Sequence, residues 1–150
     1  MRAAAILLIG IVSGAFHDFL FVNLNYQIDH VERATPGSFA HSRFQACVQG
    51  WNLSDLLRLK WALAGAFVLS TWGLCLLLLK NAQAFQRLAK PVSMIFTGVA
   101  LAALCIHALA RWVPLEEASV NLLHAIQYPV LPLVLQVALM LFPRARPEQH

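Results

Sequence analysis

Four long apolar stretches dominate the chain, and charged or helix-breaking residues separate each from the next. The hydrocarbon core of a bilayer requires a helix of roughly 20 predominantly apolar residues. The stretches reach this length and cover about residues 3–24, 57–79, 91–112 and 119–142. Backbone polar groups in lipid must be satisfied within their own segment, so we expect helices. Strands of a membrane β-barrel would alternate apolar and polar residues, and the sequence shows no such pattern.

The pattern therefore predicts an all-α fold, an integral membrane four-helix bundle in which residues 1–150 form a single polytopic transmembrane domain. Composition supports this class of protein, because 59% of the residues are hydrophobic and only 12% are charged. Soluble domains contain about 25% charged residues. So few charges cannot cover a soluble surface, and the mean hydropathy of +0.65 is too high for a disordered chain.

The sizeable loop between the first and second spans covers about residues 25–56. Its second half predicts a short amphipathic helix, with Ser38 as N-cap and Gly50 as the breaking residue. One face of this helix carries the apolar residues Phe39, Ala40, Phe44, Cys47, Val48 and Trp51. Such a helix either lies on the outer membrane surface or caps the bundle. Asn52 and Asp55 then resemble the capped start of the second spanning helix.

The basic residues indicate an orientation. One end of the predicted bundle has six basic residues and one acidic residue, namely Arg2, Lys80, Arg87, Lys90, Arg144, Arg146 and Glu148. The other end has five of each sign. The positive-inside rule then places both termini in the cytoplasm, and a bacterial inner membrane is the simplest setting. The basic residues do not interleave with aromatic residues, so we expect no nucleic-acid binding.

Polar groups inside the spans are the best pointers to function, because they are costly in lipid and usually face the protein interior. In the first span, Gly10 and Gly14 form a close-packing motif, and His17 shares their face. This face predicts self-association or contact with other membrane subunits. Asp18 is the one acidic residue well inside a span.

The third and fourth spans also carry polar stripes. His107 and Arg111 share a stripe of the third span. One face of the fourth span contains Asn121, His124, Tyr128, Pro132 and Gln136. Pro129 and Pro132 should kink the fourth span and free carbonyl groups that then need a partner.

Three histidines from three spans fall at a similar depth. At about 1.5 Å per residue, His107, His124 and His17 lie about 6, 7–8 and 10 Å below the outer interface, respectively. The sequence therefore predicts a histidine-lined polar pocket in the outer half of the bundle. The candidate residues of this pocket are His17, Asp18, His107, Arg111, Asn121, His124 and Tyr128.

Several functions fit such a pocket. We favour an accessory or ligand-binding subunit of a membrane complex, whose pocket takes a lipid head group, a quinone ring or a partner helix. One alternative is a redox protein that binds haem b or a transition metal through His17, His107 and His124. Another is a small proton-coupled transporter that uses Asp18. The sequence contains no GxSxG, HExxH, Walker or CxxC motif, so it leaves open whether the protein is an enzyme.

Overall fold

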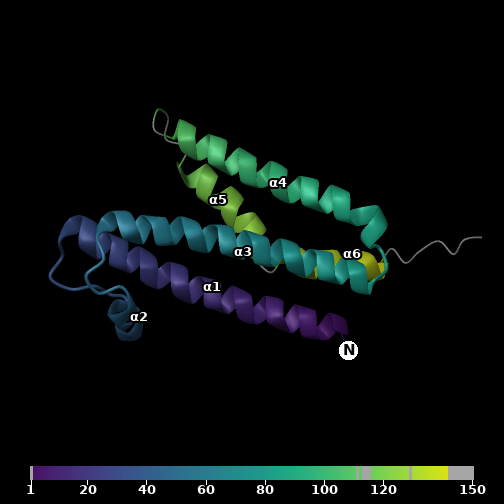
Figure 1. Ribbon diagram of the computed structural model, residues 1–150, viewed down its shortest axis with the longest axis horizontal. Helices are drawn as coiled ribbons and strands as arrows, with labels where there is room; N and C mark the ends of the chain where they lie inside the picture. Colours follow the sequence, from purple (N-terminus) through teal and green to yellow (C-terminus); the bar gives the residue numbers. More distant parts are fainter. Residues whose placement is uncertain (1, 111, 113–115, 129, 142–150) are drawn as a thin grey trace, which may run out of the picture.

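The computed structural model describes residues 2–110, 112, 116–128 and 130–141. These residues contain α-helices and no strand, as the sequence predicted (Figure 1). The helices are α1 (Arg2–Arg33), α2 (Ser42–Cys47), α3 (Leu53–Asn81), α4 (Phe85–Leu109), α5 (Glu116–Gln127) and α6 (Val130–Leu141).

Three of these helices are long and apolar enough to cross a membrane. They comprise 31 residues of α1, 29 of α3 and 25 of α4, and each contains an 18-residue stretch with a mean hydropathy of 2.1. The helices α5 and α6 pass the same test together, although the pair is bent by 54°. Length and composition thus indicate an integral membrane protein with three spans, or four if the bent pair is one span.

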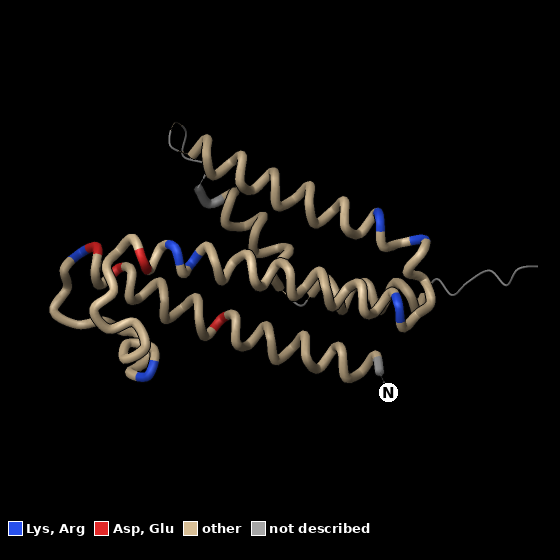
Figure 2. Tube along the Cα trace, in the orientation of Figure 1, with Lys and Arg blue, Asp and Glu red and all other residues tan. Residues whose placement is uncertain are grey.

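The central helix is α3, which packs against α1, α4, α5 and α6. Figure 1 shows α1 and α3 antiparallel and side by side, with α4 and α5 on the opposite side of α3. The start of α1, the α3–α4 turn and the end of α6 lie at one end of the molecule, which we call the N-terminal end. The loop with α2 lies at the other end, called the α2 end. Charged residues gather at these two ends, with Asp18 the exception near the middle of α1 (Figure 2).

The first helix extends beyond its predicted span, because apolarity marks the part of a helix that lipid covers and not the helical turns beyond it. The first helix continues past residue 24 to Arg33, where an ion pair of 2.7 Å joins Arg33 to Asp29 one turn earlier. The connection to α3 is therefore shorter than residues 25–56. The capped start of α3 is confirmed, since Asn52 Oδ1 accepts the backbone N–H of Asp55 at 3.0 Å.

The loop helix α2 is also shorter than predicted. Its N-cap is His41, whose Nδ1 accepts the N–H of Arg43, and not Ser38. Ser38 instead accepts the N–H of Ala40 through its hydroxyl group, in the turn before α2. Gly50 has a φ of 79°, a left-handed conformation that favours glycine, and it turns the chain toward α3.

Half of the predicted apolar face of α2 packs onto the bundle. Ala40, Phe44 and Val48 are buried in one cluster with Leu24 of α1 and Leu56 of α3. The other three members of that face, Phe39, Cys47 and Trp51, are exposed, with Phe39 at 87%. The segment therefore caps the α2 end of the α1–α3 pair.

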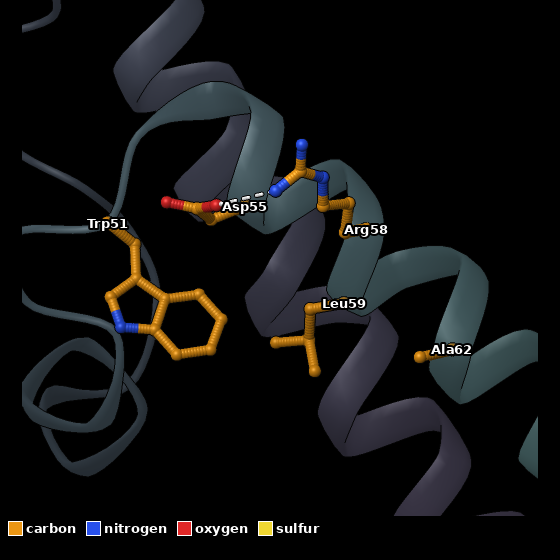
Figure 3. A pocket seen from close by; sticks show the side chains of 5 residues that line it. All are labelled: Trp51, Asp55, Arg58, Leu59 and Ala62. Atoms are coloured by element: carbon orange, nitrogen blue, oxygen red, sulfur yellow. Dashed lines mark ion pairs between the residues drawn. The ribbon is translucent and has the colours of Figure 1, made fainter.

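Beside this cap, an exposed hollow of about 380 Å³ follows the first turns of α3 (Figure 3). It is lined by Trp51, Asp55, Arg58, Leu59 and Ala62. Arg58 and Asp55 form an ion pair of 3.6 Å, and their side chains are 79% and 41% exposed. An ion pair this exposed contributes little to stability, but it neutralises both charges of the hollow.

The predicted kink of the fourth span is confirmed. The helix α5 ends at Gln127, with a last helical bond from the Tyr128 N–H to the His124 carbonyl, and α6 begins at Val130 at an angle of 54°. The Thr71 hydroxyl group of α3 donates to the backbone carbonyl of Gln127 at 2.8 Å, so a carbonyl freed by the break is satisfied inside the bundle.

Gly10 and Gly14 are buried inside the chain. The face of α1 that the sequence predicted to contact a partner therefore packs within the protein's own bundle. Small residues at such a face allow neighbouring side chains and backbone to approach closely.

Candidate functional site

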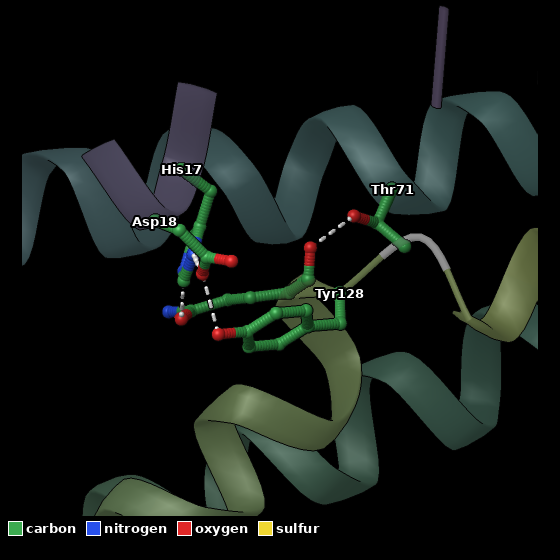
Figure 4. A network of polar contacts seen from close by, with 5 residues as sticks. His17, Asp18, Thr71 and Tyr128 are labelled. Atoms are coloured by element: carbon green, nitrogen blue, oxygen red, sulfur yellow. Dashed lines mark hydrogen bonds and ion pairs between the residues drawn. The ribbon is translucent and has the colours of Figure 1, made fainter. Parts of the chain in front are cut away.

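The most buried polar side chain of the candidate site is His17 of α1, with an exposed fraction of 1%. Its Nδ1 lies 3.2 Å from Asp18 Oδ1, and its Nε2 lies 3.1 Å from Gln127 Oε1 (Figure 4). The ring stacks on Phe21 at a centroid distance of 4.5 Å and meets the edge of Phe67 at 4.8 Å. Both nitrogens are thus engaged, and aromatic rings fix the plane of the imidazole.

Gln127 joins three helices through its amide group. Its Nε2 donates to the Ala64 carbonyl of α3 at 3.4 Å, so its Oε1 must face His17. The side chain is buried, with 3% exposed. Sequence reasoning missed this residue, although Gln127 follows His124 by three residues and so shares its helical face.

Asp18 is the second partner of His17. The Tyr128 hydroxyl group donates to Asp18 Oδ1 at 2.6 Å, and the same oxygen faces His17 Nδ1. The Asp18 side chain is 54% exposed, which is unusual for a carboxyl group inside an apolar helix. The hydrogen bonds from Tyr128 and His17 stabilise it there.

The contacts of His17 form a continuous chain of polar groups. Its Nε2 faces the Gln127 Oε1, and its Nδ1 faces the Asp18 carboxyl group. The imidazole therefore bridges a half-exposed carboxyl group of α1 and a buried amide group of α5.

His124 of α5 and Tyr128, the residue that follows α5, complete this group. The His124 ring lies 6.0 Å from the His17 ring and 5.8 Å from the Tyr128 ring, measured between centroids. The structure thus brings together four residues that the sequence singled out, and it adds one. We call this group the polar cluster: His17, Asp18, His124, Gln127 and Tyr128.

A cavity of about 180 Å³ adjoins the polar cluster between α1, α3, α4 and α5. Its polar lining consists of Asn25, Lys60, His107, Ser119, His124 and Gln127. Its apolar lining consists of Phe21, Leu57, Trp61, Ala64, Val120 and Leu123. His124 and Gln127 belong to both the polar cluster and the cavity.

The remaining predicted site residues lie elsewhere. His107 lines the cavity and packs against Trp61 at 4.7 Å between ring centroids, apart from His17. Asn121 is exposed on α5 and lines neither the cavity nor the polar cluster. Arg111 lies outside the described residues.

The structure does not support the metal site predicted from His17, His107 and His124. Among the described residues, no group of three or more His, Cys, Asp or Glu side chains is arranged to hold a metal ion. Both ring nitrogens of His17 already have partners, so neither is free to coordinate a metal or a haem iron.

Comparisons of the chain with protein-family models, curated proteins and solved structures found no match. The polar cluster and the adjoining cavity are therefore the features of the chain that indicate a function.

Proposed function

We propose that this chain is a small four-span membrane protein that binds a ligand in the cavity, as an accessory or ligand-binding subunit of a membrane complex. In this proposal both termini are cytoplasmic, and the membrane is a bacterial inner membrane. Lys80, Arg87 and Lys90 at the N-terminal end support the orientation, because the α2 end carries both signs of charge (Figure 2).

The observation that carries the proposal is that both polar and apolar side chains line the cavity. Protein interiors are close-packed, and few of their voids exceed the size of a water molecule. A cavity of about 180 Å³ is several times larger than the roughly 30 Å³ that one water occupies in the liquid. Polar groups from four helices converge on it beside aromatic and aliphatic side chains, as is typical of small-molecule sites.

Filling the cavity should abolish ligand binding. In the protein stripped of lipid by detergent, we expect an extract of membrane lipids and quinones to raise the melting temperature, because a ligand stabilises the folded state that binds it. The Leu123→Trp variant, with a larger side chain in the cavity, should lose this shift. Leu133→Trp is the matched control, since Leu133 lies on α6 outside the cavity and is 37% exposed. An equal shift in both variants would contradict the proposal.

A second candidate function is proton transfer, and the His17–Asp18 contact favours it. The half-exposed Asp18 carboxyl group connects through His17 to Gln127, which lines the cavity. Such a chain links a titratable group at the surface of α1 to the ligand site, as a proton-coupled transporter requires. Its Asp18 would exchange protons while the cavity holds the transported molecule.

Asp18→Asn separates this candidate from simple ligand binding. In proteoliposomes loaded with a pH-sensitive dye, the wild-type protein should dissipate an imposed pH gradient, and Asp18→Asn should lose most of this activity. Asp55→Asn is the control, because Asp55 is a surface residue of α3 that is paired with Arg58. Wild-type liposomes that hold their gradient as well as protein-free ones would eliminate the transport function.

Association with other membrane subunits is part of the main proposal. Because Gly10 and Gly14 are buried, association through their face would require α1 to separate from its own bundle. We therefore propose that any partner contacts another face of the protein.

A further inference from the structure

The polar groups of the cavity divide into those that are already hydrogen-bonded and those that are not. The Ser119 hydroxyl group donates to the Ala103 carbonyl at 3.1 Å, and the Gln127 amide is shared between His17 and Ala64. Within the part of the chain that the structure describes, the side chains of Asn25, Lys60, His107 and His124 make no hydrogen bond. All four side chains carry hydrogen-bond donors that a ligand would meet: a carboxamide, an ammonium group and two imidazoles.

Lys60 gives the cavity a positive charge that has no ion-pair partner among the side chains that the structure describes. Its neighbour Arg58 is paired with Asp55 (Figure 3), and Asp18 is engaged by Tyr128 and His17. Of the side chains described from residue 3 to 110 and from 118 to 128, no Asp or Glu lines the cavity. A cation half-buried among helices is costly unless it is paired, so an anion in the cavity would be stabilised.

The edge of the cavity is apolar. Leu57, Trp61 and Val120 line it and are also 40%, 39% and 38% exposed, so the cavity opens between α3 and α5 past hydrophobic side chains. Its volume of about 180 Å³ suits a head group with a few carbons rather than a whole lipid. A ligand with a polar head and a long tail would leave the tail on this edge.

We infer that the cavity binds the anionic head group of a membrane amphiphile, either a carboxylate or a phosphate. This inference rests on the proposed ligand-binding function. Lys60 supplies the charge, while His107 and His124 donate hydrogen bonds to the anionic oxygens. The apolar tail lies against Trp61 and extends between α3 and α5 into the lipid.

Trp61 provides the signal for a direct test, because it borders the cavity and contacts His107. The purified full-length protein in neutral detergent is titrated with oleate, and separately with oleyl alcohol, which has the same chain without the charge. Acetate and inorganic phosphate serve as soluble anions. Trp61→Phe identifies the part of the fluorescence change that arises at the cavity.

We expect oleate to bind about tenfold more tightly than oleyl alcohol, since one charge-assisted hydrogen bond is sufficient for such a ratio. Lys60→Gln should reduce the ratio to about twofold or less, because the glutamine side chain keeps hydrogen-bond donors but carries no charge. Arg58→Gln, two residues away, should keep the wild-type ratio because Arg58 is already paired with Asp55.

The other outcomes overturn the inference in distinguishable ways. Equal affinities for oleate and oleyl alcohol, or a preference for oleate that survives Lys60→Gln, would contradict the inferred specificity for an anionic head group. Neither result would contradict the proposed ligand-binding function. Acetate or phosphate binding as tightly as oleate would show that the ligand is a soluble anion. The absence of any saturable response at Trp61 would overturn both this inference and the proposed function.

Discussion

At the scale of single residues, His17 organises the polar cluster. It contacts Asp18 and Gln127 through its two nitrogens and packs on Phe21 and Phe67 through its ring. A buried imidazole with both nitrogens engaged is costly to remove, because its partners are left without hydrogen bonds. The contacts that fix the His17 ring therefore also stabilise the packing of α1 against α3 and α5.

His17→Ala should destabilise the protein by about 2–4 kcal/mol, since it leaves both a cavity and an unsatisfied Gln127 oxygen. Thermal or denaturant unfolding in detergent measures this loss. His41→Ala is the matched control, because His41 is exposed and caps only the short α2. A loss for His17→Ala no larger than for His41→Ala would show that the described contacts do not hold the bundle together.

At the scale of helices, the break between α5 and α6 shapes the site. Because α5 ends at Gln127, the Gln127 carbonyl is free to accept the Thr71 hydroxyl group, and the Gln127 side chain reaches His17. Tyr128, the next residue, donates its hydroxyl group to Asp18. The groups at the break therefore connect the end of α5 to both α1 and α3.

Thr71→Val should cost about 1–2 kcal/mol, because valine keeps the shape of threonine but leaves the buried Gln127 carbonyl without its donor. The same unfolding experiment applies. Thr97→Val serves as the comparison, since Thr97 is exposed on α4 and its hydroxyl group has no buried partner to lose among the described residues. Equal stabilities for the two variants would argue that the break is stabilised by other contacts.

At the scale of the whole molecule, the sequence predicted the helices better than their ends. Apolar runs identified the three helices that are long and apolar enough to span a membrane, and Pro129 and Pro132 correctly predicted the bend between α5 and α6. The extension of α1 to Arg33 escaped prediction, because polar residues interrupt the apolar run after residue 24. Ile28 and Val31 in these turns pack against the cluster that contains Leu24 and Leu56, and this packing could not be foreseen from the chain alone.

The candidate site was predictable only in part. Depth along the spans brought His17 and His124 into one group, and the structure places their rings 6.0 Å apart. Depth does not give rotation about the helix axis, so it could not separate His107, which faces Trp61, from His17. Gln127 and Thr71 were missed because their roles depend on the helix break and on packing between helices.

If the cavity holds a ligand when the protein is in its membrane, a native mass spectrum of the protein released from that membrane in neutral detergent detects it most directly. We predict one additional molecule of defined mass bound to each chain, retained in Leu133→Trp and absent in Leu123→Trp. A wild-type protein with no bound molecule, or one whose bound molecule persists in Leu123→Trp, would contradict the proposed ligand binding.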